Sequence, residues 1–240
     1  MPYYQNRSVR MSLTVPAVLP TEGRAEYRLA LRLTAGETQV ARNEYPLLGA
    51  TREWAGLAAA MAATAQPLTA GDGGTLIANG PEGVQALRAR PELQAFVEGG
   101  GRVLVMNAGE AARDLLPDVI AETVKWQPEI VNFEDEASPL LDGLQPWDVC
   151  WLYTGTGLPI AATGGFRVAD QPEVTVLATA IRPHGYLQKP TDIRQHEAVV
   201  LFEAHVGKGR VIVSEINSAA AATDPVAARL TANLLKYLSG

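Results

Sequence analysis

Hydrophobic and polar residues alternate along the first fifty positions, a pattern typical of strands with one buried face. The alternation is loose over Val9–Val15 and regular over Tyr27–Leu33, and a third apolar stretch covers Gln39–Leu48. The residues Ala35-Gly36-Glu37 between the last two stretches predict a turn. Three strands are fewer than the roughly seven of a closed β-sandwich. Residues 1–48 are therefore predicted to form a β segment that is part of a sandwich or that packs on another domain.

From residue 50 the period changes, and predicted helices alternate with short apolar strands. Apolar residues recur at helical spacing over Trp54–Ala65, and a buried strand follows at Thr75–Ala78. A helix is predicted at Pro91–Glu98, with Gly99 as its left-handed stop. The run Arg102–Met106 follows at once and is continuously apolar after its first residue, which is typical of a central parallel strand.

The second half of the chain is predicted to be rich in strands and to end in a helix. Strands are expected at Pro159–Val168, Val174–Ile181 and Ala198–His205, and a glycine turn leads from the last of these into Val211–Ser214. Asp224 and Pro225 begin the final helix as N-cap and first residue. Its buried stripe is predicted to consist of Val226, Leu230, Leu234, Tyr237 and Leu238. The pattern predicts an α/β domain with a mixed sheet over residues 49–240, preceded by the β segment of residues 1–48.

Composition narrows the functional classes. The 240 residues include 47% hydrophobic residues, enough for a full core, and 20 basic against 26 acidic residues argue against nucleic acid or an anionic membrane as the main partner. One cysteine excludes an intrachain disulfide and a thiolate zinc cluster, and three histidines leave little room for a metal site. Neither the polar start nor the alanine-rich Ala55–Ala65 predicts a signal peptide or a membrane span. The chain is expected to be soluble, in the cytoplasm or in a compartment that the sequence does not identify.

Several segments together resemble a known family. The segment from Leu93 to Met106 is similar to a helix and strand of class I glutamine-amidotransferase-like domains. Ser138–Leu144 resembles a His-Pro-Leu-Leu-x-Gly-Leu segment of their non-catalytic members, with Ser138 in place of the usual histidine. Gly207–Val213 and the helix from Asp224 complete the resemblance. Such domains occur at the C-terminal end of glycoside hydrolases that resemble the family 2 β-galactosidase group. There an immunoglobulin-like domain precedes them, and its last strands resemble the segments from Tyr27 to Leu33 and from Val40 to Leu47 in this chain.

The resemblance implies a flavodoxin-like or amidotransferase-like three-layer sandwich with a mixed sheet, plus a short N-terminal β segment. It also implies where a nucleophile would stand. An amidotransferase carries a cysteine at the sharp turn after its central strand, activated by a distant histidine. The matching turn here is Asn107-Ala108-Gly109, and an asparagine cannot form an acyl-enzyme. Ammonia-releasing chemistry is therefore expected to be absent, and no catalytic residue is predicted.

Other candidates for chemistry have simpler structural explanations. Cys150 lies among aromatic residues and could act as a nucleophile with His184 or His196, but a buried small hydrophobe is the commoner role. Glycoside hydrolysis requires two carboxylates across one sugar. Glu203 and Glu215 lie on the two predicted hairpin strands and could approach each other, while the adjacent Glu134–Glu136 predict a solvated loop.

A binding site is predicted at the carboxyl ends of the parallel strands, where α/β sheets bind their ligands. The polar residues expected there are Asn79, Asn107, Glu110 and Asn217, which could bind a sugar or simply cap turns and helix ends. Tryptophan rings could stack on a sugar if they are exposed. The tryptophans are Trp54, Trp126, Trp147 and Trp151.

The function favoured by the resemblance is that of a non-catalytic accessory domain of a glycoside hydrolase, with a structural, oligomerisation or carbohydrate-recognition role. Its partners would be the other domains of the hydrolase or a second copy of the chain, and possible ligands are carbohydrates. No cofactor and no metal are predicted. Two alternatives remain open: a stand-alone hydrolase with a site at the strand ends, and a sensor that binds a small ligand on the same fold.

Overall fold

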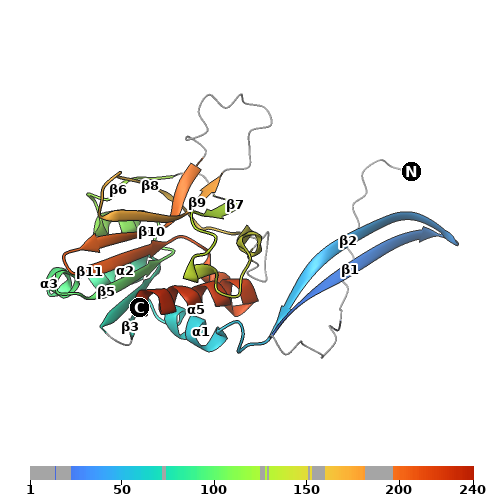
Figure 1. The fold of residues 1–240 in the computed structure, drawn as a ribbon, viewed down its shortest axis with the longest axis horizontal. Coiled ribbons are helices and arrows are strands. Elements are labelled where there is room, and N and C mark those ends of the chain that lie inside the picture. Colours follow the sequence, from blue (N-terminus) through green and yellow to red (C-terminus); the bar gives the residue numbers. More distant parts are fainter. Residues whose placement is uncertain are drawn as a thin grey trace, which may run out of the picture. The chain divides into compact units, whose positions relative to one another are not determined.

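The computed structural model describes residues 14, 23–71, 74–124, 128, 130–150, 152, 160–181 and 197–240. The chain forms two compact units, Met1–Thr51 and Arg52–Gly240, which are described separately (Figure 1). Apart from Thr14, the strand predicted at Val9–Val15 lies outside the described residues.

The first unit contains a long antiparallel hairpin. Strand β1 (Arg24–Ala35) pairs with β2 (Thr38–Ala50) across the turn at Gly36 and Glu37, as the alternation predicts. Tyr27 lies opposite Leu47, so the apolar residues of the two strands share one face. The other face carries charge: the Arg28 guanidinium forms a 3.0 Å ion pair with the Glu44 carboxylate across the strands.

The second unit is built on a mixed sheet of nine described strands. Its order is β3-β4-β5-β11-β10-β8-β6, and β9 pairs with both β10 and β7. Strands β4, β5 and β11 are mutually parallel, and the remaining pairings are antiparallel. The strands are β3 (Leu68–Gly71), β4 (Thr75–Asn79), β5 (Arg102–Met106), β6 (Ile120–Thr123), β7 (Ile130–Phe133), β8 (Phe166–Val168), β9 (Val174–Ile181), β10 (Glu197–Val206) and β11 (Gly209–Ser214).

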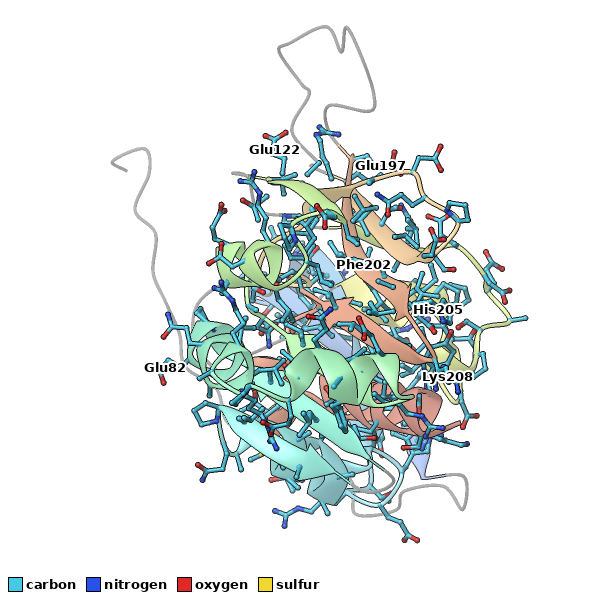
Figure 2. The ribbon with its side chains drawn as sticks, turned by 90° about the vertical axis from the view of Figure 1, so that its left-hand side faces the viewer. Glu82, Glu122, Glu197, Phe202, His205 and Lys208 are labelled. Atoms are coloured by element: carbon cyan, nitrogen blue, oxygen red, sulfur yellow. The ribbon has the colours of Figure 1, made fainter. Side chains whose placement is uncertain are left out.

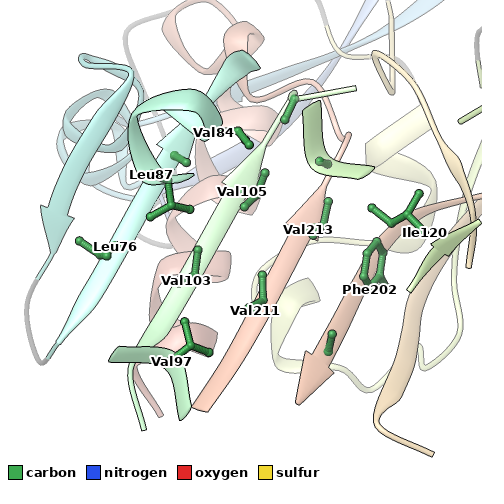
Figure 3. Close-up of a cluster of buried hydrophobic side chains, with 14 of the residues drawn as sticks. Leu76, Val84, Leu87, Val97, Val103, Val105, Ile120, Phe202, Val211 and Val213 are labelled. Carbon is green, nitrogen blue, oxygen red and sulfur yellow. The ribbon is translucent and has the colours of Figure 1, made fainter. Parts of the chain in front are cut away.

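Helices pack on both faces of the parallel strands. On one face α2 (Gly80–Arg88), α3 (Leu93–Glu98) and α4 (Glu110–Leu115) enclose a valine-rich core with β4, β5 and β11 (Figure 3). On the other face α1 (Leu57–Thr64) and α5 (Pro225–Ser239) pack side by side. Because both faces are covered, these strands read as continuous apolar runs. The unit is therefore a mixed α/β sandwich, as the sequence predicts.

Two local predictions are wrong. The strand expected over Pro159–Val168 shrinks to β8, because Gly164 and Gly165 lie directly before it. A Cβ on Gly165 would come within 2.8 Å of the Ala198 Cβ, so this close approach requires glycine and replaces regular strand pairing. The left-handed residue after α3 is Gly100, with φ of 111°, whereas Gly99 is still right-handed with φ of −75°.

Helix α5 begins as predicted and is the main support of its face of the sheet. The Asp224 carboxylate accepts hydrogen bonds from the backbone N–H groups of Val226 and Ala227, and Pro225 occupies the first turn. The predicted stripe is buried at four of its positions and half-buried at Tyr237. The four buried members are Val226, Leu230, Leu234 and Leu238.

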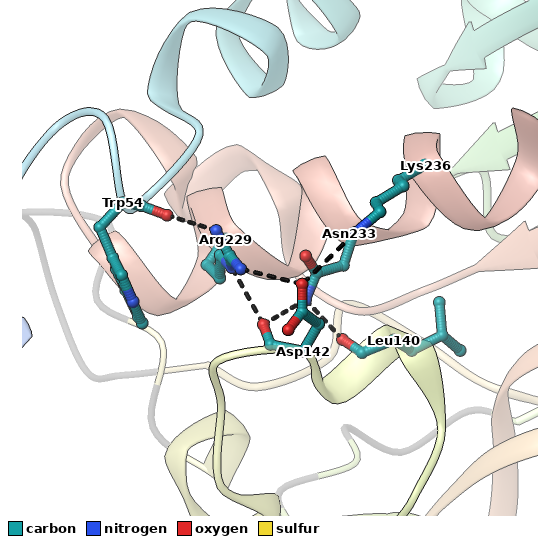
Figure 4. A network of polar contacts seen from close by, with 6 residues as sticks. All are labelled: Trp54, Leu140, Asp142, Arg229, Asn233 and Lys236. Carbon is teal, nitrogen blue, oxygen red and sulfur yellow. Dashed lines mark hydrogen bonds and ion pairs between the residues drawn. The ribbon is translucent and has the colours of Figure 1, made fainter. Parts of the chain in front are cut away.

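The segment from Ser138 to Leu144 is tied to α5 by a polar network (Figure 4). The Asp142 carboxylate lies 3.1 Å from the Arg229 guanidinium, and the Asn233 amide donates to the carbonyls of Leu140 and Asp142, each at 2.9 Å. Arg229 also lies over the Trp54 ring, 5.4 Å from its centroid. Within the segment, the 3-10 helix η1 (Pro139–Leu141) buries both of its leucines and is capped by the Ser138 hydroxyl.

Candidate functional site at the ends of β5 and β11

The carboxyl ends of β5 and β11 form the switch point of the sheet. After β5 the chain turns to the face covered by α4, whereas after β11 it turns to the opposite face, where the 3-10 helix η4 (Ser218–Ala222) leads into α5. The two strands are neighbours in parallel register, with Ser214 beside Met106. Divergent connections of this kind leave a crevice between adjacent strand ends, and open α/β sheets bind ligands there.

The turn after β5 holds Asn107 in an unusual backbone conformation. Asn107 has a φ of 51°, and among the described residues it is the only one other than glycine with a positive φ. Asparagine tolerates this left-handed region better than most residues. Its side chain is held at both ends: the amide nitrogen donates to the Ser218 hydroxyl, and the amide oxygen, 3.3 Å from the Thr163 hydroxyl, shares the single proton of that hydroxyl with the nearer Glu215 carboxyl. The turn is therefore fixed from both sides of the crevice.

The Glu215 carboxyl fills the space below this turn. Its Oε1 atom accepts hydrogen bonds from the backbone N–H groups of Ala108 and Gly109, at 2.9 and 2.8 Å. Its Oε2 atom accepts a bond from the Thr163 hydroxyl at 2.9 Å, and only 1% of the residue is exposed. Two successive N–H groups that converge on one oxygen form an anion-binding nest, which this chain occupies with its own side chain.

Burial raises the pKa of Glu215. Loss of hydration is the largest influence, because it penalises the ionised carboxylate. The hydrogen bonds from Gly109, Thr163 and Ala108 act in the opposite direction and offset part of it. The site is therefore one in which a carboxyl proton is held to higher pH than on an exposed glutamate.

A second segment of the chain is built over the crevice. Residues 161–163 run antiparallel to the segment that follows β11: the Thr163 N–H donates to the Glu215 carbonyl, and the Asn217 N–H donates to the Ala161 carbonyl. Strand β8 then pairs with Val199 of β10, just beyond the residues of β10 that pair with β11. The segment that follows β11 is thus paired with the backbone of residues 161–163.

The four residues predicted for the site bond to different segments of the chain. Asn107 lies in the Glu215 network as described above. The Asn79 amide at the end of β4 donates to the Thr64 carbonyl at 3.3 Å, and the buried Asn217 amide donates to the Ile160 carbonyl at 3.1 Å. Glu110, at the start of α4, accepts from the Thr123 hydroxyl and pairs with Arg113. The amides of Asn79, Asn107 and Asn217 therefore hold neighbouring segments of the chain in place.

Glu215, Thr163 and Ser218 were not predicted as members of this network. Glu215 is the first residue after the apolar run of β11, and it therefore lies at the same sheet edge as Asn107 once β5 and β11 are recognised as parallel neighbours. Recognising that β5 and β11 are neighbours could therefore have placed Glu215 beside the turn at Asn107. Thr163 and Ser218 lie in connections without a periodic pattern, and no sequence signal indicates them.

The suggested approach of Glu203 and Glu215 is wrong. Glu203 lies opposite Ile212 in the β10–β11 ladder, whereas the Glu215 N–H bonds to the Val200 carbonyl. Glu203 instead accepts a hydrogen bond from the Tyr237 hydroxyl at 2.9 Å, and the Arg210 guanidinium lies 3.6 Å away. The two carboxyls therefore belong to separate networks and do not flank a common space.

Of the tryptophan, cysteine and histidine residues considered for binding or catalysis, the structure describes only some. Trp147 in η2 (Pro146–Cys150) is 68% exposed, and Trp54 is covered by Arg229. Trp126, Trp151, His184 and His196 lie outside the described residues, as does the side chain of Cys150. Within the part of the chain that the structure describes, no group of three His, Cys, Asp or Glu residues is arranged to hold a metal ion.

Comparison with known proteins yields few relatives. No protein-family model matches the chain, and neither does any curated protein sequence. Among solved structures, cytoplasmic protein STM3548 from Salmonella typhimurium is 11% identical, with a TM-score of 0.40 over 89% of this chain and 96% of that one. Cytoplasmic protein STM1381 from Salmonella typhimurium LT2 is 12% identical, with a TM-score of 0.38 over 90% and 97%. At these scores the likeness supports no inference about function.

The helices were also compared with the requirements of a membrane span. Over the described ranges, no helix combines the length and the hydropathy that crossing a bilayer requires.

Proposed function

We propose that the chain is a non-catalytic α/β module of the amidotransferase-like, flavodoxin-like type, which serves as an accessory domain of a glycoside hydrolase. The observation that carries the non-catalytic part is the Glu215 carboxyl bound to the amides of Ala108 and Gly109. Acyl-transfer enzymes with a nucleophile on such a turn use the N–H of the following residue to bind the oxyanion. Here that N–H belongs to Ala108 and is already paired.

Three further features agree with this proposal. The residue at the tip of the turn is Asn107, whose amide is not a nucleophile of acyl transfer and is bonded to Ser218 and Thr163. The segment around Thr163 pairs with the residues that directly follow β11. A substrate carbonyl would have to displace a buried internal carboxyl and a strand-like connection at the same time. The accessory role in a glycoside hydrolase rests on the sequence resemblance.

The non-catalytic part is tested with the purified chain on nitrophenyl glycosides and on glutamine, with nitrophenol and ammonia as readouts. We expect no turnover above buffer for the wild type, and the same for Asn107→Ala. Turnover by the wild type that disappears in a folded Asn107→Ala or Glu215→Gln variant would contradict the proposal.

The hydrolase context has a separate test in the genomic sequence around the gene. We expect a barrel domain with paired catalytic glutamates, encoded in the same reading frame or in an adjacent gene. If neither location encodes such a domain, the chain retains its non-catalytic character but loses its assignment to a glycoside hydrolase.

A further inference from the structure

The sheet face that carries α2, α3 and α4 is covered over only part of its width. These short helices lie over β4, β5 and β11, and Figure 2 views this face with Phe202 near its middle on β10. Val199 and Val206 of β10 and Val174 of β9 pack at the margin of the core and remain partly exposed. The described residues thus leave the antiparallel half of this face without a helical layer.

Two adjoining hollows lie on this face, one among the helices and one over the antiparallel strands. The first, of about 470 Å³, lies between α3 and α4 and will be called the helix-side hollow. The second, of about 580 Å³, lies over β8, β9 and β10 and will be called the strand-side hollow. They share a wall in which the Ala169 N–H donates to the Val119 carbonyl, and the Gln171 amide donates to the Asp118 carbonyl.

The helix-side hollow has an apolar floor. Leu93 and Val97 of α3 line it on one side, and Leu115 and Leu116 at the end of α4 on the other. Between them lie valines of β5, β10 and β11: Val103 and Val211 are buried at the bottom of the hollow, and Val206 at its margin is partly exposed. A hollow of this composition, flanked by two helices above a sheet, is a place where one more helix could pack in a layered α/β unit.

The charged side chains that line the two hollows are mostly negative. Their described linings include five carboxylates and one guanidinium, that of Arg167, which forms an ion pair with Glu122 at 3.8 Å. His205 and Lys208 stand at one end of this face, outside both linings (Figure 2). The carboxylates belong to Glu98, Asp118, Glu134, Asp170 and Glu197.

We propose that the helix-side hollow docks an amphipathic helix of a partner protein. Its apolar stripe would cover Leu93, Leu115 and Val206, and Lys or Arg residues along its edge would face Glu98 and Asp118. Apolar anchors in a groove give such complexes their affinity, and complementary charges select the partner and its orientation. This inference rests on the geometry of the face, and it holds whether or not the chain belongs to a glycoside hydrolase.

The test uses the full chain and two fluorescent peptides of about 16 residues, each with leucines at helical spacing. One peptide carries lysine at its remaining positions, and the other carries glutamate. We expect fluorescence anisotropy to show saturable binding of the lysine peptide and no binding of the glutamate peptide. Failure of the lysine peptide to bind the wild type would overturn the proposal.

Matched variants locate the binding. The pair Glu98→Lys with Asp118→Lys should weaken binding about fivefold or more, since two partly exposed ion pairs together are worth about 1 kcal/mol. The pair Glu53→Lys with Glu136→Lys changes the net charge equally at exposed sites outside both linings and should leave binding unchanged. Equal weakening by both pairs would show general charge attraction and overturn the proposal.

The apolar contact has its own variant and an independent measurement. Leu115→Ser should weaken binding by about tenfold, the value of one buried leucine. Amide chemical-shift changes in the wild type should centre on α3, α4 and Val206, a readout that does not depend on any variant folding. Shifts centred elsewhere would overturn the proposal. So would a dimer of the chain that Leu115→Ser dissociates, because a second copy would then occupy the hollow.

Discussion

The Glu215 carboxyl shows how one residue can close a site that the fold would otherwise leave open. An anion-binding pair of amides, a hydroxyl and a strained turn converge on it, and each of these could serve a ligand. Because the group that occupies them is a side chain of the same chain, no free ligand has to be captured from solution. The arrangement stabilises the turn at Asn107 instead of leaving it free for binding.

Replacing Glu215 by glutamine should remove a pH-dependent loss of stability. The pKa of Glu215 is raised in the folded protein, so its contribution is complete below pH ~4.5 and is lost as the pH rises through the folded pKa. The wild type should lose up to about 1.4 kcal/mol per pH unit from this group over that window. The glutamine side chain of the Glu215→Gln variant keeps an acceptor for the two amides and presents a donor to the Thr163 oxygen, so the fold should persist.

Urea unfolding of both proteins from about pH 4 to about pH 8 measures this effect. The difference in unfolding free energy between wild type and Glu215→Gln should change in favour of the variant as the pH rises above ~4.5 and should level off above the folded pKa of Glu215. Glu136→Gln, at an exposed position, serves as the control and should follow the wild type. Parallel curves for the wild type and Glu215→Gln would show that burial does not shift this group.

At the scale of elements, the N-cap of α5 is the residue that the sequence predicts, Asp224. Asp224→Ala removes the acceptor for two N–H groups at the start of the helix and should destabilise the unit by about 1 kcal/mol. Chemical denaturation followed by circular dichroism would measure the change. Asp224→Asn retains a capping oxygen and should lose much less; equal losses in the two variants would assign the effect to charge rather than to capping.

The strands and the last helix were predictable because their signals are local. The runs at β4, β5, β9 and β11 are bounded by turns and are buried on at least one face, so hydrophobic pattern alone marks them. The segment before β8 was not predictable, because Gly165 allows a close approach to Ala198, and Gly164 one to the Glu215 carboxyl, and both partners are distant in sequence. Alternation of hydrophobic and polar residues can predict a strand, but it does not identify the segment that will lie beside that strand.

The candidate site was predictable only in part, and for the same reason. The turn at Asn107 follows directly from the strand before it, so its position could be inferred. The partners that determine its chemistry come from three distant connections, at Thr163, Glu215 and Ser218. Asn79 and Asn217 have the right residue type and the right edge of the sheet, but their amides turn to carbonyls of neighbouring segments.

For the molecule as a whole, the chain divides at Thr51 into two units that we expect to differ in stability. Both core clusters of the larger unit consist of residues after position 52, and the smaller unit contributes a two-stranded hairpin. Isolated two-stranded hairpins are marginally stable in water, whereas a large sheet with helices on both faces can fold alone.

Truncation tests this difference. A protein comprising residues 52–240 should unfold cooperatively, with a thermal midpoint close to that of the full chain. A peptide comprising residues 23–51 should show little strand signal by circular dichroism at room temperature. If the truncated protein lacks a cooperative transition, the α/β unit requires the hairpin for its folding.

The end of α5 offers a practical consequence. The Arg210 guanidinium donates to the carbonyls of Tyr237 and Leu238, and the Arg102 guanidinium donates to that of Ser239. Both arginines stand where β5 and β11 begin, at the edge of the sheet opposite Asn107 and Glu215. A dye or surface tether attached at Gly240 would therefore be joined to a helix end that is hydrogen-bonded to the sheet, and it would lie away from Asn107 and Glu215 during single-molecule or sensor measurements.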